Sequence, residues 1–386
     1  MSDLQRILAA YSQVISEHAV SPDALHARKM APGFSGAPVY RIVRVLGVDS
    51  QVREQSCYCL KRVGAWPRSP AAIERDGVVR AVSQFCPSII APLPSDSGQL
   101  SVSHKGNAWQ LTKWFDGIAL STRPSDAHCH LAGRAIAEVH AALARHPDHR
   151  KHLTTQPAGL AERVGQLQTM ETLRSQLREA CLTTSKLSLQ MQGQVGPSNT
   201  TEAMLLEEAR AQAASLGVFL KRAIDCFASH DRSWQPLISQ LDWTRNQHNA
   251  GKCVLETGFA WRDLHREQML WRHSSSGRES PLSTDAVGLI DHEFLTWDFL
   301  AMDLSRWAQS FVLPESVLRQ TLAGYRERHP FPDRDASLAS TLASAADWIT
   351  IANWLRWLIL EQRVFQLSAA RIESRLEPIL NRLEAG

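Results

Sequence analysis

Two stretches determine the architecture, Phe259-Ala-Trp-Arg-Asp-Leu-His-Arg-Glu-Gln-Met-Leu-Trp271 and Val287-Gly-Leu-Ile-Asp-His-Glu293. Each contains an aspartate, Asp263 or Asp291, close to a run of apolar residues. Residues 272–285 lie between the two runs and include three consecutive serines and a glycine, which predicts a hairpin loop. Folding this loop back is expected to bring the two aspartates to neighbouring strand ends.

The side chains at those strand ends suit one kind of metal site. Asp263, Asp291 and Gln268 offer two carboxylates and one amide. Hard cations such as Mg²⁺ prefer oxygen ligands of these types. If one acid binds the cation, the other remains available as a general base. The alternative is that the acids only solvate a loop and cap a strand.

Composition limits the classes of function. The chain has 386 residues, enough for one large domain or for two to three ordinary ones. Its 42 basic and 39 acidic residues give a net charge of +3. No global electrostatic field therefore favours nucleic acid or an anionic membrane as a partner.

The seven cysteines predict a reducing environment. They are scattered, odd in number and mostly set among apolar residues, which is typical of buried thiols. Cys57 and Cys59 form a Cys-x-Cys pair on one strand face, for which a metal or redox role remains an alternative. The sequence shows no N-terminal apolar signal, and its longest apolar run is interrupted by Arg356. We expect a cytoplasmic protein.

The first part of the chain predicts a helix followed by β-structure. Apolar residues at helical spacing predict an amphipathic helix over residues 3–19. Alternating residues then predict a hairpin within residues 39–63, preceded by a loop of small residues at 32–38. Lys61 lies in the second strand of this hairpin. Alternation puts it opposite Leu60, facing either a cleft or solvent.

A second helix is predicted to begin after the N-cap Ser69. Glu74 shares a helical face with Val78 and Phe85, so we expect its carboxylate on the core-facing side. A buried carboxylate needs a cation, and Lys61 is the nearest candidate along the chain. The alternative is an exposed first-turn acid that stabilises the helix dipole.

The rest of the chain is mainly helical by pattern. Residues 108–117 predict a strand that ends in a glycine turn and leads into a helix over residues 127–143. Such a crossover is a natural hinge between a β-rich lobe and a helical lobe. His140 lies on the apolar side of this helix, where a lone histidine is usually a core residue. Residues 147–250 are polar and helical in period, and helical patterns return after Trp307.

This order of elements resembles the aminoglycoside phosphotransferase and choline kinase superfamily, whose members are relatives of the protein kinases. The family reads His-Gly-Asp-Leu-His-x-x-Asn-x-Leu in its catalytic segment, then Ile-Asp-x-Glu followed by Asp-Leu. The resemblance implies an α+β, protein-kinase-like two-lobe fold. Residues 1–116 would form a small antiparallel β lobe, and residues 117–386 a large, mainly helical lobe with an insertion at about 147–250.

The resemblance also implies roles for individual residues. Asp263 takes the place of the catalytic aspartate, and Asp291 and Gln268 take the places of the two metal ligands. His265, Glu293, Asp298 and Asp303 match family positions around that centre, and His140 matches a structural histidine. The implied nucleotide-binding residues are Lys61, its helix partner Glu74, Gly36 in the phosphate-covering loop, and Leu111, Lys113 and Trp114 beside the adenine.

The implied activity is transfer of a phosphate from ATP, with Mg²⁺, to a hydroxyl of a small molecule such as a sugar, an aminoglycoside or an amino alcohol. Two departures from the family pattern suggest an alternative. Gln268 stands where the family has Asn, and Trp261-Arg262 stand where it has His-Gly. A kinase-like pseudoenzyme that binds nucleotide or a protein partner without turnover would fit these changes. The sequence does not specify the acceptor or the oligomeric state.

Overall fold

The computed structural model contains two compact units. Met1–Pro157 and Glu256–Ala336 form the first, and Ala158–Leu255 and Ser337–Gly386 form the second. These units do not correspond to the two predicted lobes, because the division at residue 116 falls inside the first unit. The lobe boundary remains a prediction. Residues 32–35 of the predicted small-residue loop and residues 273–285 of the predicted hairpin loop lie outside the described residues. The structure describes residues 3–16, 25–30, 36–48, 51–190, 207–208, 211–230, 233–272 and 286–385.

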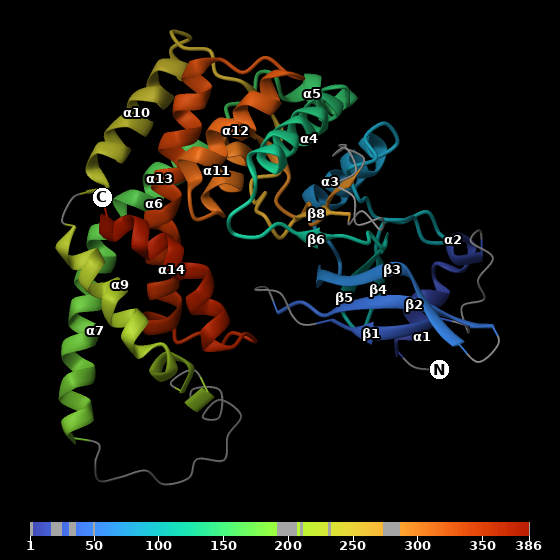
Figure 1. Cartoon of the computed structure of the whole chain (residues 1–386), viewed down its shortest axis with the longest axis horizontal. Helices are drawn as coiled ribbons and strands as arrows, with labels where there is room; N and C mark the ends of the chain where they lie inside the picture. The colour runs from blue at the N-terminus through green and yellow to red at the C-terminus, as the bar shows by residue number, and fades with distance from the viewer. Residues whose placement is uncertain are drawn as a thin grey trace. The chain divides into compact units, whose positions relative to one another are not determined.

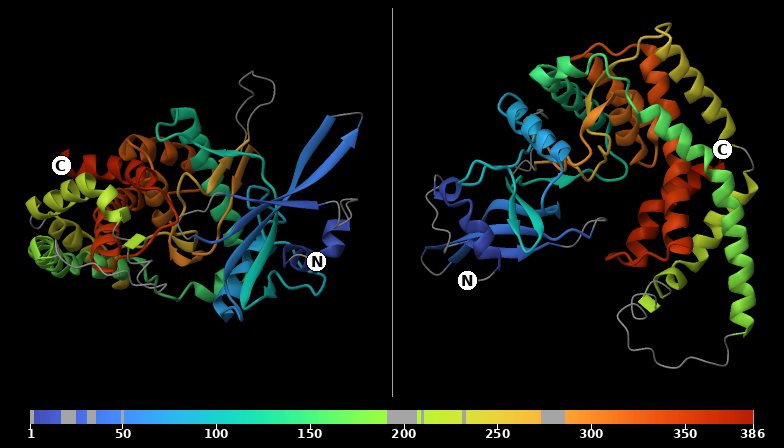
Figure 2. Two further views of the ribbon diagram at one scale, coloured as in Figure 1. Left: turned by 90° about the horizontal axis from the view of Figure 1, so that it is seen from below. Right: turned by 180° about the vertical axis from the view of Figure 1, so that it is seen from behind.

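The first unit contains a five-stranded antiparallel sheet, ordered β1-β2-β3-β5-β4 (Figure 1). The long hairpin of β2 and β3 projects clearly in the left view of Figure 2 and confirms the predicted hairpin. Lys61 lies in β3 and pairs in register with Val39 of β2 and Gln110 of β5. The strands are β1 (Leu25–Lys29), β2 (Val39–Val48), β3 (Gln51–Ala65), β4 (Val102–His104) and β5 (Asn107–Lys113).

Two short helices stand in place of the single N-terminal helix predicted over residues 3–19. They are α1 (Asp3–Ala9) and α2 (Ser12–Ser16), separated by a turn at Tyr11. Tyr11 is fully buried in the apolar core of the sheet, and its hydroxyl donates to the Trp109 carbonyl at 3.2 Å. The apolar pattern thus predicted the buried face correctly, whereas the break allows Tyr11 to reach β5.

Helix α3 (Pro70–Val82) begins as predicted, because the Ser69 hydroxyl accepts a hydrogen bond from the Ala72 amide at 3.3 Å. The prediction that Glu74 faces the core is wrong. Glu74 is exposed, and Phe85 beyond the helix is also exposed. The buried stripe instead includes Ala72, Asp76 and Val79, at spacings of four and three residues. A polar side chain, Asp76, therefore occupies the inner face.

Two glycines permit a close crossing of α4 (Asp126–Ala144) and α12 (Pro314–Arg326), which lie together in Figure 1. A Cβ atom on Gly133 would lie 1.9 Å from the Thr321 carbonyl oxygen. One on Gly324 would lie 1.8 Å from the His130 carbonyl oxygen. Since real Cβ atoms do not approach so closely, glycine is required at both positions. Helix α4 confirms the helix predicted over residues 127–143.

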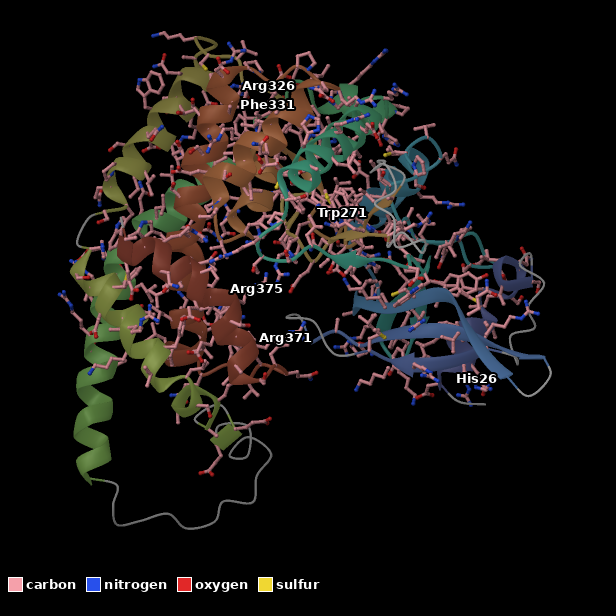
Figure 3. The ribbon with its side chains drawn as sticks, viewed as in Figure 1. His26, Trp271, Arg326, Phe331, Arg371 and Arg375 are labelled. Carbon is pink, nitrogen blue, oxygen red and sulfur yellow. The ribbon has the colours of Figure 1, made fainter. Side chains whose placement is uncertain are left out.

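Two short sheets include strands formed by the sequence segments 259–271 and 287–293. One has the order β6-β8-β9 and the other pairs β10 with β7, all antiparallel. Trp271 at the end of β8 is labelled in Figure 3. The remaining elements of this unit are β6 (Ile118–Ala119), α5 (Pro147–His152), β7 (Thr257–Ala260), β8 (Met269–Trp271), β9 (Val287–Leu289), β10 (Thr296–Phe299) and α11 (Ala301–Gln309).

The second unit is helical in its described parts, and α7 is the long green helix in the right view of Figure 2. Its core includes Phe227 stacked on Trp234, with Trp348 packed against both rings. Trp234 and Trp348 are therefore core residues of this unit. Arg371 and Arg375, labelled in Figure 3, lie about one turn apart on the last helix. The helices are α6 (Gly159–Gln168), α7 (Met170–Gln190), α9 (Gly217–Ser229), α10 (Gln235–Asn249), η3 (Arg356–Leu360) and α14 (Ala369–Ala385).

Helix α13 (Asp333–Leu355) contributes residues to both units. Among the described helices, none has the length and apolar character needed to cross a membrane.

Candidate functional site

The structure brings together two loops of the first unit, which we call the Asp263 loop (residues 261–268) and the Asp291 loop (residues 290–293). Strand β8 follows the first loop and pairs with β9, which leads into the second. The Ile290 amide donates to the Gln268 carbonyl at 2.9 Å. The Trp261 indole donates to the carbonyls of Ile290 at 3.2 Å and Asp291 at 3.0 Å. This confirms the predicted pairing of the two apolar runs.

Asp263 is partly exposed and has a basic neighbour. Arg306 of α11 contacts Asp263 Oδ1 through Nε at 2.9 Å. Gln268 Nε2 lies 3.4 Å from Asp263 Oδ2, and His265 Nε2 lies 3.8 Å from the same oxygen. About a third of the Asp263 side chain remains exposed.

A buried carboxylate holds the start of the Asp263 loop. Asp303 Oδ2 accepts from the Trp261 amide at 2.7 Å, and Oδ1 accepts from the Arg262 amide at 2.6 Å. His140 Nε2 lies 2.9 Å from Asp303 Oδ2, and its Nδ1 lies 2.8 Å from the Tyr325 hydroxyl. We call Asp303, His140 and Tyr325 the Asp303 cluster. The structure thus places Asp303 behind the loop and His140 within the core.

Arg262 has a backbone angle φ of 62°, in the left-handed region that favours glycine. The family pattern has glycine at this position. Here the two Asp303 hydrogen bonds hold the backbone of an arginine in that conformation. The Arg262 side chain then forms an ion pair with the buried Asp298, with Nε at 3.0 Å from Oδ2.

Lys61 Nζ lies 2.8 Å from Asp291 Oδ1 and 2.8 Å from Glu293 Oε1. Burial lowers the pKa of Lys61, but the two carboxylates raise it more, so the net pKa lies above its ordinary value. The lysine is therefore positively charged at neutral pH. The expected partner, Glu74, is exposed on α3, whereas the Asp291 loop supplies both of these ion pairs.

The residues around Asp291 fit a hard cation. Gln268 is buried, and its Oε1 atom has no hydrogen-bond partner among the described residues. An unsatisfied buried acceptor costs about 1–3 kcal/mol, which a bound cation would remove. No group of three or more His, Cys, Asp or Glu side chains suited to a metal occurs in the described ranges. Mg²⁺ held by one or two carboxylates and by substrate phosphates does not need such a group.

The segment expected beside an adenine has several main-chain groups already engaged. The Leu111 carbonyl accepts from the Leu93 amide at 2.7 Å, and the Trp114 amide donates to the Cys57 carbonyl at 3.0 Å. Lys113 ends β5, and Arg41 lies over the Trp114 ring at 5.0 Å from its centroid. A nucleotide base would therefore use other main-chain groups of this segment.

Gly36, the glycine expected in the phosphate-covering loop, has a φ of 64°. This left-handed conformation favours glycine. Residues 32–35 of the same predicted loop lie outside the described residues.

Comparison with solved structures identifies the fold. An amicoumacin kinase in complex with AMP-PNP, Ca²⁺ and Ami superposes with a TM-score of 0.51 at 12% identity, covering 99% of this chain and 96% of that one. A spectinomycin phosphotransferase with ADP and spectinomycin gives 0.51 at 11% identity, covering 97% and 96%. A choline kinase from Cryptosporidium parvum gives 0.50 at 10% identity, covering 98% and 95%.

The fold is that of the aminoglycoside phosphotransferases and choline kinases. No family model and no curated protein matches the sequence itself. The predicted fold class is therefore confirmed, including the antiparallel N-terminal sheet and the mainly helical remainder. The roles assigned to individual residues remain predictions.

Within this phosphotransferase fold, sequence reasoning missed five polar residues near the site. Arg306 lies three positions after the expected Asp303, and its helical spacing places it on a face adjoining the Asp263 loop. Asp76 could have been found by testing each acid of α3 against the apolar stripe, since only Asp76 lies on it. The other three side chains contact Asp76, namely Arg68, Gln110 and His292.

Proposed function

We propose that this protein transfers the γ-phosphate of ATP, with Mg²⁺, to a hydroxyl of a small molecule. The observation that carries the proposal is the position of Lys61 Nζ, 2.8 Å from both acids of the Asp291 loop. In the same unit, that loop is hydrogen-bonded through Trp261 to the segment that contains Asp263. Such positioning and charge compensation are the main requirements of phosphoryl transfer.

Each residue of the site has its own role in this reaction. Asp291 and Gln268 would hold Mg²⁺, with Glu293 beside them. Bound Mg²⁺ would supply positive charge against the phosphate oxygens. Lys61 would bind the α- and β-phosphates by exchanging its carboxylate contacts for phosphate oxygens. Asp263 would accept the proton of the acceptor hydroxyl, a step that typically contributes about 10²- to 10⁴-fold.

The acceptor belongs to the class of small hydroxyl compounds. The structures with this fold are kinases of amicoumacin, spectinomycin and choline. Aminoglycosides, sugars and amino alcohols are therefore the first compounds to test, with ATP consumption as the readout.

The test is the substitution Asp263→Asn. We expect at least about a 100-fold fall in kcat because the amide cannot accept the proton. The melting temperature and the binding of Mg·ATP should be retained. The matched control is Glu267→Gln, an equal change of charge in the same loop, at a partly exposed residue that contacts Arg266. Turnover that is unchanged by Asp263→Asn would overturn the assignment.

One observation favours a second candidate, a nucleotide-binding protein without turnover. Arg306 Nε lies 2.9 Å from Asp263 Oδ1, so the arginine already contacts one of the two carboxylate oxygens that an acceptor hydroxyl would approach. The discriminating measurement is phosphate transfer by protein shown to bind Mg·ATP. Binding without transfer to any hydroxyl compound in the screen supports this candidate and excludes the first one for those acceptors.

A further inference from the structure

A buried polar cluster lies directly behind the Asp291 loop. It consists of Arg68, Asp76, Gln110 and His292, which we call the Asp76 cluster. Asp76 Oδ2 accepts from Gln110 Nε2 at 2.6 Å and also contacts Arg68 Nη1. Asp76 Oδ1 lies 3.0 Å from His292 Nε2. All four side chains are at least nine-tenths buried.

In this cluster Asp76 is the acceptor, and Arg68, Gln110 and His292 are the donors. An ionised carboxylate only accepts, so Nε2 of His292 must carry the hydrogen that it shares with Asp76. Asp76 thus receives donors from the segment before α3, from β5 and from the Asp291 loop. A buried carboxylate with three donors is well satisfied, whereas removal of one donor leaves an imperfectly paired charge.

His292 lies between the two acids that contact Lys61. Its neighbour Asp291 has a φ of 60°, a strained conformation for a residue other than glycine. Such a conformation persists only where surrounding contacts enforce it. The Trp261 indole bonds to the Asp291 carbonyl, and the Trp261 ring lies edge-on to His292 at 6.4 Å between centroids. The hydrogen bond to Asp76 fixes the other side of the loop.

The cluster also reaches the strand beside Lys61. Gln110 of β5 is the register partner of Lys61 in β3. Asp76 therefore contacts, through side chains, both the loop that holds the acids and the strand next to the lysine. Helix α3 is connected to the site by this route, while Glu74 on the same helix points to solvent.

We propose that His292 is a positioning residue, held by Asp76, that sets the orientation of Asp291 and Glu293 for Mg·nucleotide. This inference rests on the proposed function. His292 itself binds neither metal nor substrate. It acts because its hydrogen bond to Asp76 fixes the backbone between the two acids. Partners of this kind typically change metal affinity by about 10- to 100-fold when they are lost.

The experiment compares His292→Phe with His292→Gln in the full chain. Phenylalanine keeps a ring but has no donor, whereas the glutamine amide can reach Asp76. The probe is Mn²⁺ in the presence of ADP, with bound metal measured by electron paramagnetic resonance. We expect about a 10- to 100-fold weaker Mn²⁺ affinity for the Phe variant and near-native affinity for the Gln variant. Melting temperatures of both variants report stability separately.

Three results would overturn the inference. These are native Mn²⁺ affinity in the Phe variant, an equal loss in the Phe and Gln variants, or a loss of stability with unchanged metal affinity in the folded fraction. If the Phe variant does not fold, His292→Asn replaces it, because its shorter amide stops short of Asp76. Loss in the Asn variant with retention in the Gln variant then supports the proposal, and equal affinity in the two opposes it.

The same titration separates this inference from the proposed function. Wild-type protein that binds neither Mn²⁺·ADP nor Mg·ATP contradicts the proposed function. Wild-type protein that binds both, with unchanged affinity in the His292 variants, contradicts the positioning role alone.

Discussion

Two buried aspartates hold the two loops of the site in different ways. Asp303 accepts the main-chain amides of Trp261 and Arg262. Asp76 accepts from three side chains, Arg68, Gln110 and His292, and from no main-chain amide in the described part of the chain. Each aspartate has a histidine among its partners, His140 for Asp303 and His292 for Asp76. Asp303 therefore holds the Asp263 loop by hydrogen bonds to its main chain. Asp76 holds the Asp291 loop by a hydrogen bond to one side chain, His292.

This difference explains which departures from the family pattern the fold tolerates. Main-chain amides are present whatever the side chain, so Trp261 and Arg262 can replace histidine and glycine while the loop stays attached to Asp303. The contact of His292 with Asp76 is made by the side chain, so it is lost when the new residue has no donor at that position. The Asp291 loop depends on a donor at that one position, and we expect substitutions there to affect metal binding more than substitutions at Arg262.

The largest expected effect is that of Asp303→Ala, which breaks the backbone type of attachment. It leaves the buried Trp261 amide, the partly buried Arg262 amide and the His140 donor without their acceptor. At about 1–3 kcal/mol for each unsatisfied donor, we expect a loss of about 5 kcal/mol in the free energy of unfolding. That is a large fraction of the stability of an ordinary domain. Urea unfolding followed by tryptophan fluorescence measures it.

Asp303→Asn is the matched control, because its amide keeps one acceptor oxygen and nearly the same volume. We expect a smaller loss of stability than for the alanine variant. An alanine variant as stable as the wild type would show that Asp303 does not hold the loop, and the comparison between the two clusters would fail.

An intermediate effect is expected for Arg68→Met in the Asp76 cluster. The change removes the cation from a buried carboxylate, but Gln110 and His292 continue to donate to it. Hydrogen bonds to charged groups contribute about 1.5–3 kcal/mol, so we expect a loss of about 2 kcal/mol. Thermal and urea unfolding check this value.

Arg68→Lys keeps the charge and serves as the control for Arg68→Met, with most of the stability retained. If Arg68→Met loses as much stability as Asp303→Ala, then the contacts of Asp76 and those of Asp303 contribute equally to stability, contrary to this prediction. Equal unfolding midpoints for the methionine variant and the wild type would show that Asp76 needs no cation.

The smallest expected effect is that of Tyr325→Phe, which tests the far end of the Asp303 cluster. Burial raises the pKa of Tyr325 well above its usual value, so the hydroxyl stays protonated, and its oxygen lies 2.8 Å from His140 Nδ1. Loss of one such hydrogen bond should cost about 1 kcal/mol. Hydrogen exchange at the Trp261 and Arg262 amides should also become faster.

Tyr11→Phe is the matched control for that prediction. It removes the hydroxyl contact to the Trp109 carbonyl, in the core of the five-stranded sheet. A similar loss of stability is expected, but without faster exchange at Trp261 and Arg262. Equal exchange in the two variants would mean that Tyr325 contributes stability alone and does not influence the Asp263 loop.

Sequence patterns predicted the elements whose signals are local. The hairpin that contains Lys61, the cap at Ser69 and helix α4 all follow from spacing and from local hydrogen bonds. The pairing of β8 with β9 followed from two apolar runs separated by a polar loop. These features depend on residues close together in the chain, and the order of the elements then indicated the fold.

The partners of buried charges could not be predicted in the same way. Asp76 and His292 are 216 positions apart, and Arg306 and Asp263 are 43 apart. Nothing local distinguishes Asp76 from Glu74 except the phase of the helix, and a stripe extended to Phe85 selects the wrong face. Glu74 was therefore assigned to the buried face, although the helix ends at Val82 and Phe85 lies beyond it.

The crossing of α4 and α12 has a consequence for the site as well as for packing. Helix α4 carries His140 and α12 carries Tyr325, so the separation of the two helix axes determines how these side chains meet. That separation depends on hydrogen atoms in place of methyl groups at Gly133 and Gly324. Two residues with no reactive group thus determine part of the geometry behind Asp263, and a search limited to reactive side chains would overlook both.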